Sequence, residues 1–271
     1  MREEMLRKVF EHAEHVDEWC AQHGGIRFMT ALFGSQNYNL DNEHSDVDTK
    51  SVIIPELNDW TWGDIEKYNT TITMPDGSHA EIKAFPSMCK QWIKGNINFL
   101  ETLYTEYIDI APGWEWLYNE LLGVRDNLSR HNLYRSGQTW LGYLHQAIER
   151  AFNSTSESLG YKPEYGYNPK SLMNAFRIKE SFIRFFMFNR PFDEAIDMGD
   201  IRTMLLDIKE HPMPYDIAIT YMKDLIKWMD KVGHPYIKDH YTDKEVFNVD
   251  FYMRQLCKMV YVTLGENEVC G

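Results

Sequence analysis

The sequence predicts an α+β protein in which a part containing strands is followed by a part made of helices. Short apolar or alternating segments, bounded by glycine, proline and asparagine, lie before Gly113, whereas nearly every later segment has apolar residues at helical spacing. With 271 residues and 44% hydrophobic content, the chain can bury one large core or two modest ones. We therefore expect two domains, residues 1–112 with the sheet and residues 113–271 with the helices.

The first elements are predicted to be a helix and a buried strand. Residues 3–21 place apolar side chains along one stripe and end near Gly24-Gly25, so this helix should pack on the sheet. Residues 26–33 are apolar, and Gly34-Ser35 stops them abruptly, which is typical of a strand that ends in a tight turn. Gly34 has no Cβ, so backbone amides can approach a ligand closely, and Ser35 adds a hydroxyl group. This turn can hold phosphate oxygens.

Asp46 and Asp48 are two residues apart on the predicted second strand, so both carboxylates should share one face while Val47 points into the core. Neighbouring carboxylates repel unless a cation lies between them, and Mg²⁺ takes carboxylate, water and phosphate oxygens. The pair therefore indicates a divalent cation site. The same pattern also occurs in loops, where the first acid caps a turn. Lys50 follows on the same face and could simply moderate the repulsion.

A hairpin is predicted over residues 70–85, because two alternating segments flank the turn Pro75-Asp76-Gly77-Ser78. In the second of these segments Glu81 and Lys83 share one face, opposite Ile82. If the apolar face packs on helices, Glu81 faces the cation site and supplies a third carboxylate. The alternative is an acid on a solvent-exposed face.

The rest of the chain is predicted to be mainly helical. Residues 107–111 are a candidate further strand, and Asn98 with Glu101 fits an N-cap followed by an acid in the first turn of a helix. Residues 153–168 break the helical rhythm and are either a substrate-covering loop or a linker. The predicted helices span residues 114–124, 134–152, 170–188, 201–209, 215–232 and 246–264.

The spacing of Gly34-Ser35, ten residues, Asp46-x-Asp48 and a later acidic strand resembles the signature of the DNA polymerase β-like nucleotidyltransferase superfamily. Two further segments, residues 94–104 and 167–177, resemble the Asn-Pro-Asn-x-Leu-Glu and Lys-x-x-x-His-x-x-Arg segments of the predicted nucleotidyltransferases of the RNA repair pathway DNA polymerase β family. The resemblance covers residues 26–186. Ile97 replaces the proline of the first segment, and Asn174 stands where histidine is expected in the second.

This resemblance implies a polymerase β-like catalytic domain, with a mixed sheet flanked by helices, followed by an all-α domain that binds substrate or nucleotide. The implied reaction transfers a nucleoside monophosphate from a nucleoside triphosphate such as ATP to an acceptor hydroxyl, with release of pyrophosphate. Asp46, Asp48 and Glu81 would hold two Mg²⁺ or Mn²⁺ ions and carry the catalysis.

The same resemblance assigns the nucleotide contacts. Gly34 and Ser35 would grip the leaving phosphates. Lys170 and Arg177 lie seven residues apart on one predicted helix, hence on one face, and would neutralise triphosphate charge. Two alternatives use the same residues: a nucleotide-binding module without catalysis, acting as a sensor, inhibitor or antitoxin, and a metal-dependent phosphodiester hydrolase.

Net charge and cysteine spacing restrict the expected partners and the expected cellular compartment. The net charge of −13, with no basic run, disfavours a long polynucleotide, so the expected acceptor is a structured RNA end, a protein side chain or a small molecule. The four cysteines have neither zinc-site nor disulfide-framework spacing, which indicates reduced thiols in a cytoplasmic protein. Because the sequence starts with charged residues and has no apolar run of eighteen residues, we expect no secretion signal and no membrane partner.

Overall fold

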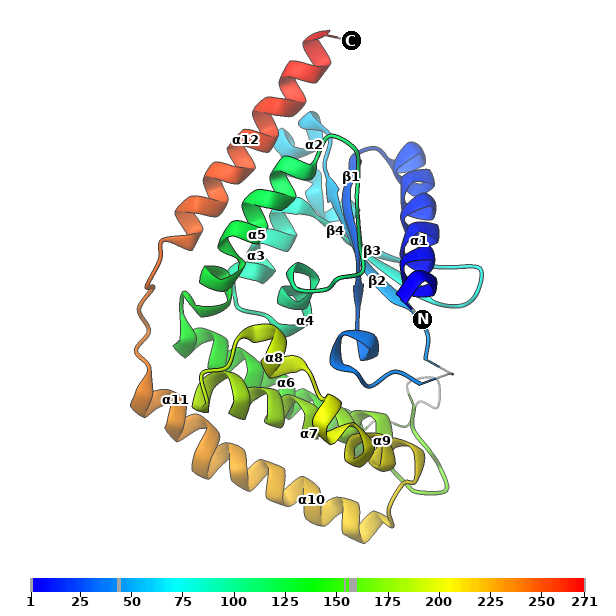
Figure 1. Cartoon of the computed structure of the whole chain (residues 1–271), viewed down its shortest axis with the longest axis vertical. Helices are drawn as coiled ribbons and strands as arrows, with labels where there is room; N and C mark the ends of the chain where they lie inside the picture. The colour runs from blue at the N-terminus through cyan, green and yellow to red at the C-terminus, as the bar shows by residue number, and fades with distance from the viewer. Residues whose placement is uncertain (1, 43–44, 154, 156–159, 271) are drawn as a thin grey trace. The chain divides into compact units, whose positions relative to one another are not determined.

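The protein is an α+β structure with one mixed five-stranded sheet and helices before and after it (Figure 1). The computed structural model describes residues 2–42, 45–153, 155 and 160–270, without the side chains of residues 267–270. The chain divides into two compact units. The first comprises Met1–Asn37, Asp41–His131 and Glu245–Gly271, and the second comprises Tyr38–Leu40 and Asn132–Lys244.

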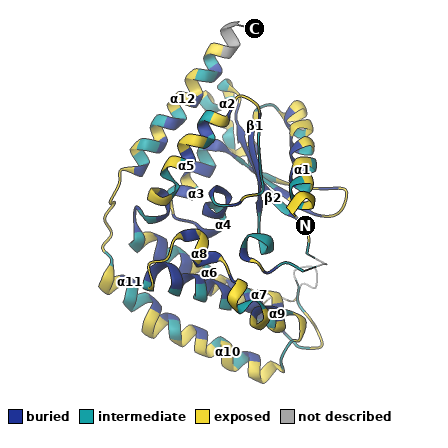
Figure 2. Cartoon of the chain, viewed as in Figure 1, coloured by how far each residue is buried: buried dark blue, intermediate teal, exposed yellow. Residues whose placement is uncertain are grey.

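The sheet lies in the first unit and has the strand order β3-β4-β2-β1-β5. β1 is antiparallel to β2 and β5, β4 is antiparallel to β3, and β2 runs parallel to β4. The predicted hairpin is confirmed as β3 and β4, and the candidate last strand is β5. The central strands are almost wholly buried (Figure 2). The bounds are β1 Ile26–Phe33, β2 Asp48–Ile54, β3 Thr70–Thr73, β4 His79–Ala84 and β5 Ile108–Ile110.

Helices cover both faces of this sheet within the first unit (Figure 1). α1 packs on one face, and α3 packs on the other with α5 and α12 outside it. An ion-pair network fixes α1 to two strands, because buried Arg27 on β1 bonds Asp17 of α1 at 2.9 Å and Asp109 of β5 at 2.6 Å. The helices of this unit are α1 Arg2–His23, α2 Leu57–Trp62, α3 Phe85–Ile93, α4 Ile97–Leu100, α5 Glu115–Arg130 and α12 Val249–Cys270, with 3-10 turns η2 Asp64–Tyr68 and η3 Glu101–Leu103. The 3-10 turn η1 Ser35–Tyr38 also begins in this unit, and its last residue is assigned to the second.

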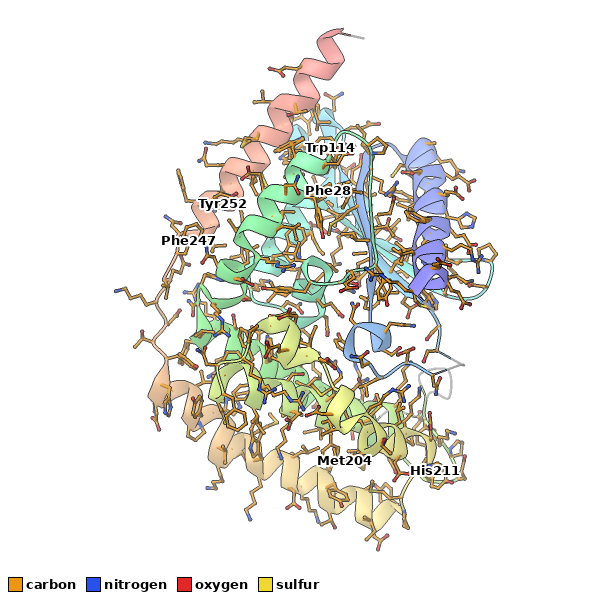
Figure 3. All side chains as sticks on the ribbon, viewed as in Figure 1. Phe28, Trp114, Met204, His211, Phe247 and Tyr252 are labelled. Atoms are coloured by element: carbon orange, nitrogen blue, oxygen red, sulfur yellow. The ribbon has the colours of Figure 1, made fainter. Side chains whose placement is uncertain are left out.

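The last helix belongs to the first unit although it ends the chain. α12 buries Met253, Leu256 and Val260 along one stripe. Its Tyr252, labelled in Figure 3, donates its hydroxyl to Glu120 of α5 at 2.6 Å. The compact units therefore have different limits from the expected domains, since α5 and α12 both lie after residue 112 and pack in the unit that holds the sheet.

The second unit is a helical bundle with an aromatic core. Trp140 lies 5.1 Å from the ring centres of both Phe185 and Phe186 and 6.0 Å from that of Phe192. Within the helices predicted over residues 170–188 and 215–232, the last turn is π-helical, and α11 follows the second of these turns directly. The elements are α6 Leu133–Asn153, α7 Pro169–Phe182, η5 Ile183–Met187, α8 Phe192–Ile196, η6 Gly199–Ile201, α9 Arg202–Glu210, α10 Tyr215–Trp228, η7 Met229–Gly233 and α11 His234–His240.

The predicted loop over residues 153–168 is described in part. Lys162 pairs with Tyr167 in an isolated β-bridge, and residues 154 and 156–159 of the loop lie outside the described residues.

Among the described helices, none is both long and apolar enough to cross a membrane.

Candidate functional site

The glycine turn and the acid pair meet at one edge of the β1–β2 pair. β1 ends at Phe33, which lies opposite Asp48, the first residue of β2. Gly34 follows with φ +103°, a conformation that favours glycine, and Ser35 begins η1. A Cβ at Gly34 would meet no described atom within 4 Å, so the space beside its Cα is open. The structure thus brings Gly34, Ser35 and Asp48 together, as the sequence predicts.

The two aspartates occupy different structural positions. β2 begins only at Asp48, so the expectation that Asp46 also lies on the strand is wrong; Asp46 precedes it and is exposed. The Asp46 carbonyl accepts a hydrogen bond from the Gln36 side chain at 2.8 Å, which ties this segment to the turn after Gly34. On Asp48, Oδ1 accepts from the His79 backbone N–H at 2.9 Å.

Buried neighbours set the direction of these side chains. Val47 packs with Val9 of α1, and Thr49 is hydrogen bonded to His12 of α1 at 2.9 Å. Because side chains alternate along an extended chain, Asp48 between them lies on the sheet face opposite α1. The alternation predicted around Val47 is therefore present.

Glu81 lies on that same face. Its strand neighbours Ala80, Ile82 and Ala84 pack with Val16 and Cys20 of α1, which leaves Glu81 on the opposite side of β4. The sequence predicts that Glu81 faces the cation site if the apolar face of its strand packs on helices. The apolar face does pack on a helix.

Two lysines bind the Glu81 carboxylate. Lys50 lies opposite Glu81 in the parallel β2–β4 register and donates to its Oε2, while Lys83 lies 3.1 Å from Oε1. Burial by itself would raise the pKa of Glu81, but the ammonium groups of Lys50 and then Lys83 outweigh it, so the pKa is lowered. Glu81 is therefore an ionised acid held in two ion pairs.

Aromatic rings enclose the Lys50 ammonium group. Its Nζ lies 3.7 Å from the centre of the Phe33 ring and 4.6 Å from that of Phe99, and Lys50 is 4% exposed. The Nζ of Lys83 also lies 5.4 Å from the Phe99 ring centre. The sequence predicts the face on which Lys50 lies and a role in moderating the aspartates. It does not predict Glu81 as the partner of Lys50, because strand pairing sets that contact.

These contacts decide which residues fit a divalent ion. Within the described part of the chain, no group of three or more histidine, cysteine, aspartate or glutamate side chains is arranged to hold a metal. Asp46 and Asp48 remain the two acids of this region that could hold Mg²⁺, because this ion commonly takes one or two carboxylates and fills its shell with water and phosphate. Glu81 does not fit as a third ligand, since both of its oxygens are in ion pairs.

Glu101 has a role that sequence analysis missed. The N-cap of α4 is Asn96, not Asn98, and Glu101 follows the helix instead of lying in its first turn. Glu101 is 1% exposed, and its Oε2 accepts from the Gly34 backbone N–H at 3.3 Å and from Asn37 Nδ2 at 3.2 Å. The N–H expected to meet phosphate therefore bonds a buried carboxylate in this structure.

The two basic residues predicted to contact nucleotide lie on α7 of the second unit and differ in burial. Lys170 is exposed in the first turn, whereas Arg177 is 4% exposed. The Arg177 guanidinium lies 3.9 Å from the centre of the Tyr38 ring, and Nε donates to Asn174 at 3.3 Å. Among the described residues, the buried Nη1 of Arg177 has no hydrogen-bond partner. The sequence predicts that Lys170 and Arg177 share one face of the helix. It does not predict the burial of Arg177, which depends on packing within the bundle.

Comparison with known proteins finds no matching family model and no curated protein of matching sequence.

Proposed function

We propose that this protein is a polymerase β-like nucleotidyltransferase that depends on Mg²⁺ or Mn²⁺. The observation that supports this most strongly is the meeting of Gly34 and Ser35 with Asp48 at one edge of the β1–β2 pair, with Asp46 two residues before the strand. A hydroxyl group on a glycine turn beside two carboxylates suits the phosphates of a nucleoside triphosphate and the cation that travels with them.

In the proposed reaction, an acceptor hydroxyl oxygen forms a bond to the α-phosphorus of the triphosphate. The bond from that phosphorus to the bridging oxygen breaks, pyrophosphate leaves, and the acceptor proton passes to solvent. Asp46 and Asp48 would hold the cation, which when bound supplies positive charge to the phosphates. Ser35 would donate its hydroxyl to a phosphate oxygen, and Lys170 and Arg177 are proposed further phosphate contacts.

The ion pairs of Glu81 alter the task expected for this residue. A carboxylate with a lowered pKa is a poor general base, because it holds a proton weakly. We therefore propose that ionised Glu81 orients Lys50 and the acceptor rather than taking its proton. The acceptor is proposed to be a small molecule, a protein side chain or a structured RNA end, in keeping with the net charge of −13.

A second candidate is a module that binds nucleotide without turning it over. It is favoured by one observation, namely that Lys50 and Lys83 already neutralise the third carboxylate, so that the described residues lack a three-acid metal site. Such a module would keep the phosphate contacts and give no product.

The test is incubation with each α-labelled nucleoside triphosphate and Mg²⁺ or Mn²⁺, offering total RNA, protein extract and small metabolites as acceptors. The variant Asp46→Asn/Asp48→Asn is compared with the wild type, and Asp64→Asn serves as a matched control because Asp64 is an exposed acid of the same unit. Label transfer with pyrophosphate release, lost in the double variant and kept in the control, supports the transferase. Binding without product supports the module, and cleavage of a phosphodiester without transfer supports the hydrolase.

A further inference from the structure

The clearest disagreement between the site and a two-ion mechanism is the position of Lys50. Two ions need carboxylate oxygens from all three acids, yet the oxygens of Glu81 are bonded to ammonium groups. We propose that the Lys50 ammonium group takes the place of one of the two metal ions, so that the chain binds a single divalent ion at Asp46 and Asp48. This inference rests on the proposed function.

Strand register places the ammonium group where a second ion would have to lie. Lys50 follows Asp48 by two residues on the same face of β2, and it lies directly opposite Glu81 of β4. A cation shared by the acids of these neighbouring strands must sit between β2 and β4 on this face. Because Lys50 is part of β2, its positive charge is fixed at this position. Glu81 is therefore neutralised without an ion from solution.

The surroundings of Lys50 suit an ammonium group better than Mg²⁺. Phe33 and Phe99 present ring faces to Nζ at 3.7 and 4.6 Å, which stabilises a monovalent organic cation and displaces water. Mg²⁺ loses water reluctantly and prefers octahedral oxygen ligands. A dry, aromatic position next to one carboxylate therefore favours the lysine.

Charge balance leads to the same conclusion. Lys50 and Lys83 together reduce the charge of the three carboxylates at Asp46, Asp48 and Glu81 to a single negative charge. One divalent ion with its bound phosphates can be accommodated by that site, whereas a second would lie beside a buried ammonium group and be repelled in a medium of low dielectric constant.

The experiment counts bound Mn²⁺ per chain by electron paramagnetic resonance, with and without a non-hydrolysable ATP analogue, so activity is not required. We expect one ion for the wild type and two for Lys50→Met, because methionine keeps the packing between Phe33 and Phe99 but removes the charge that blocks Glu81. Lys50→Arg should keep the count at one.

Lys83→Met is the matched control. Lys83 bonds the same carboxylate but is 22% exposed, and removing it leaves Lys50 in place, so the count should stay at one. Thermal unfolding of each variant shows that it is folded before ions are counted. If a variant fails to fold, the wild-type count with and without the analogue still decides between one ion and two.

The outcomes separate this inference from the proposed function. Two ions in the wild type, or one in folded Lys50→Met, overturn the role of Lys50 and leave a metal-dependent transferase standing. Neither ion nor analogue bound by the wild type overturns the proposed function and the inference with it.

Discussion

The buried carboxylate of Glu101 accepts a hydrogen bond from the backbone N–H of Gly34 at 3.3 Å. A phosphate at the same N–H would lie beside this negative charge in a poorly solvated position, where repulsion is screened weakly. Glu101 therefore opposes anion binding at the turn while holding the turn in place through Asn37.

Replacing Glu101 with glutamine should strengthen nucleotide binding. Glutamine keeps an oxygen that can accept from Gly34 and Asn37 but removes the charge, and we expect the Kd for ATP to fall by about tenfold, equivalent to ~1.4 kcal/mol. Titration calorimetry measures the change. Glu106→Gln, at an exposed acid of the same unit, should leave the Kd unchanged. Weaker binding by folded Glu101→Gln would show that the carboxylate supports the site instead of opposing it.

Replacing Arg177 with methionine should weaken nucleotide binding without destabilising the fold. Its Nη1 is buried without a hydrogen-bond partner among the described residues, so the charge adds little to stability. We expect the free energy of unfolding to change by less than about 1 kcal/mol and the Kd for ATP to rise by about tenfold. Urea unfolding and calorimetry give the two values.

Arg184 provides the contrasting control for Arg177. It is a buried arginine of the same unit, but it bonds Glu180 at 2.8 Å and Asp200 at 2.8 and 2.9 Å. Arg184→Met should cost roughly 2 kcal/mol, because it removes these hydrogen bonds and a further one from Nη1 to the Asp197 carbonyl, while the acids that remain are solvated. A loss of similar size in Arg177→Met would indicate a purely structural residue.

His12 should make the protein less stable in mild acid. Its ring nitrogens bond Thr49 and Ser78 at 2.9 Å each, and burial lowers its pKa to about 4, with Lys8 acting in the same direction and Asp76 opposing. The unfolded chain takes up a proton near pH 6.5 and the folded chain only near pH 4. The free energy of unfolding should therefore fall by about 3 kcal/mol as the pH drops between these values.

Urea unfolding of the wild type and His12→Gln at pH 7 and pH 4.5 tests this dependence. Glutamine keeps a donor and an acceptor but does not titrate, so the variant should lose less stability over this interval. His15→Gln, at a half-exposed position of the same helix, should retain most of the wild-type loss. Equal losses in His12→Gln and the wild type would assign the acid sensitivity to other groups.

Alkylation should modify Cys257 before the other two described thiols. The Cys89 thiol donates to Cys257 and lowers its pKa, against the opposing effect of burial. Burial raises the pKa of Cys89 and raises that of Cys20 to about 12. Because the thiolate is the nucleophile, iodoacetamide at pH 8 should label half-buried Cys257 first, as peptide mass spectrometry would show.

The donor role of Cys89 can be tested by the same labelling. Cys89→Ala removes the hydrogen bond and should slow labelling of Cys257 several-fold at pH 7. Cys20→Ala should leave the rate unchanged, because Cys20 belongs to α1 and packs on the sheet, away from the contact between Cys89 and Cys257. A rate for Cys89→Ala equal to that of the wild type would show that the thiol contact does not control the reactivity of Cys257.

Local patterns were sufficient to predict the first strand, the glycine turn and the two faces of β4. An apolar run that stops at Gly34 and an alternation around Ile82 depend only on neighbouring residues, because side-chain direction in a strand repeats every two residues. Asp48 could be placed beside the turn for the same reason, since β1 and β2 are consecutive strands.

Tertiary structure alone decided what these residues contact. Lys50 meets Glu81 only because β2 and β4 pair in parallel, and Cys89 meets Cys257 only because α12 returns to the first unit. The burial of Glu101 arises in the same way, from the packing of η3 near the end of β1. Such contacts are chosen by the burial of surfaces far apart in the chain, and no local period in the sequence records them.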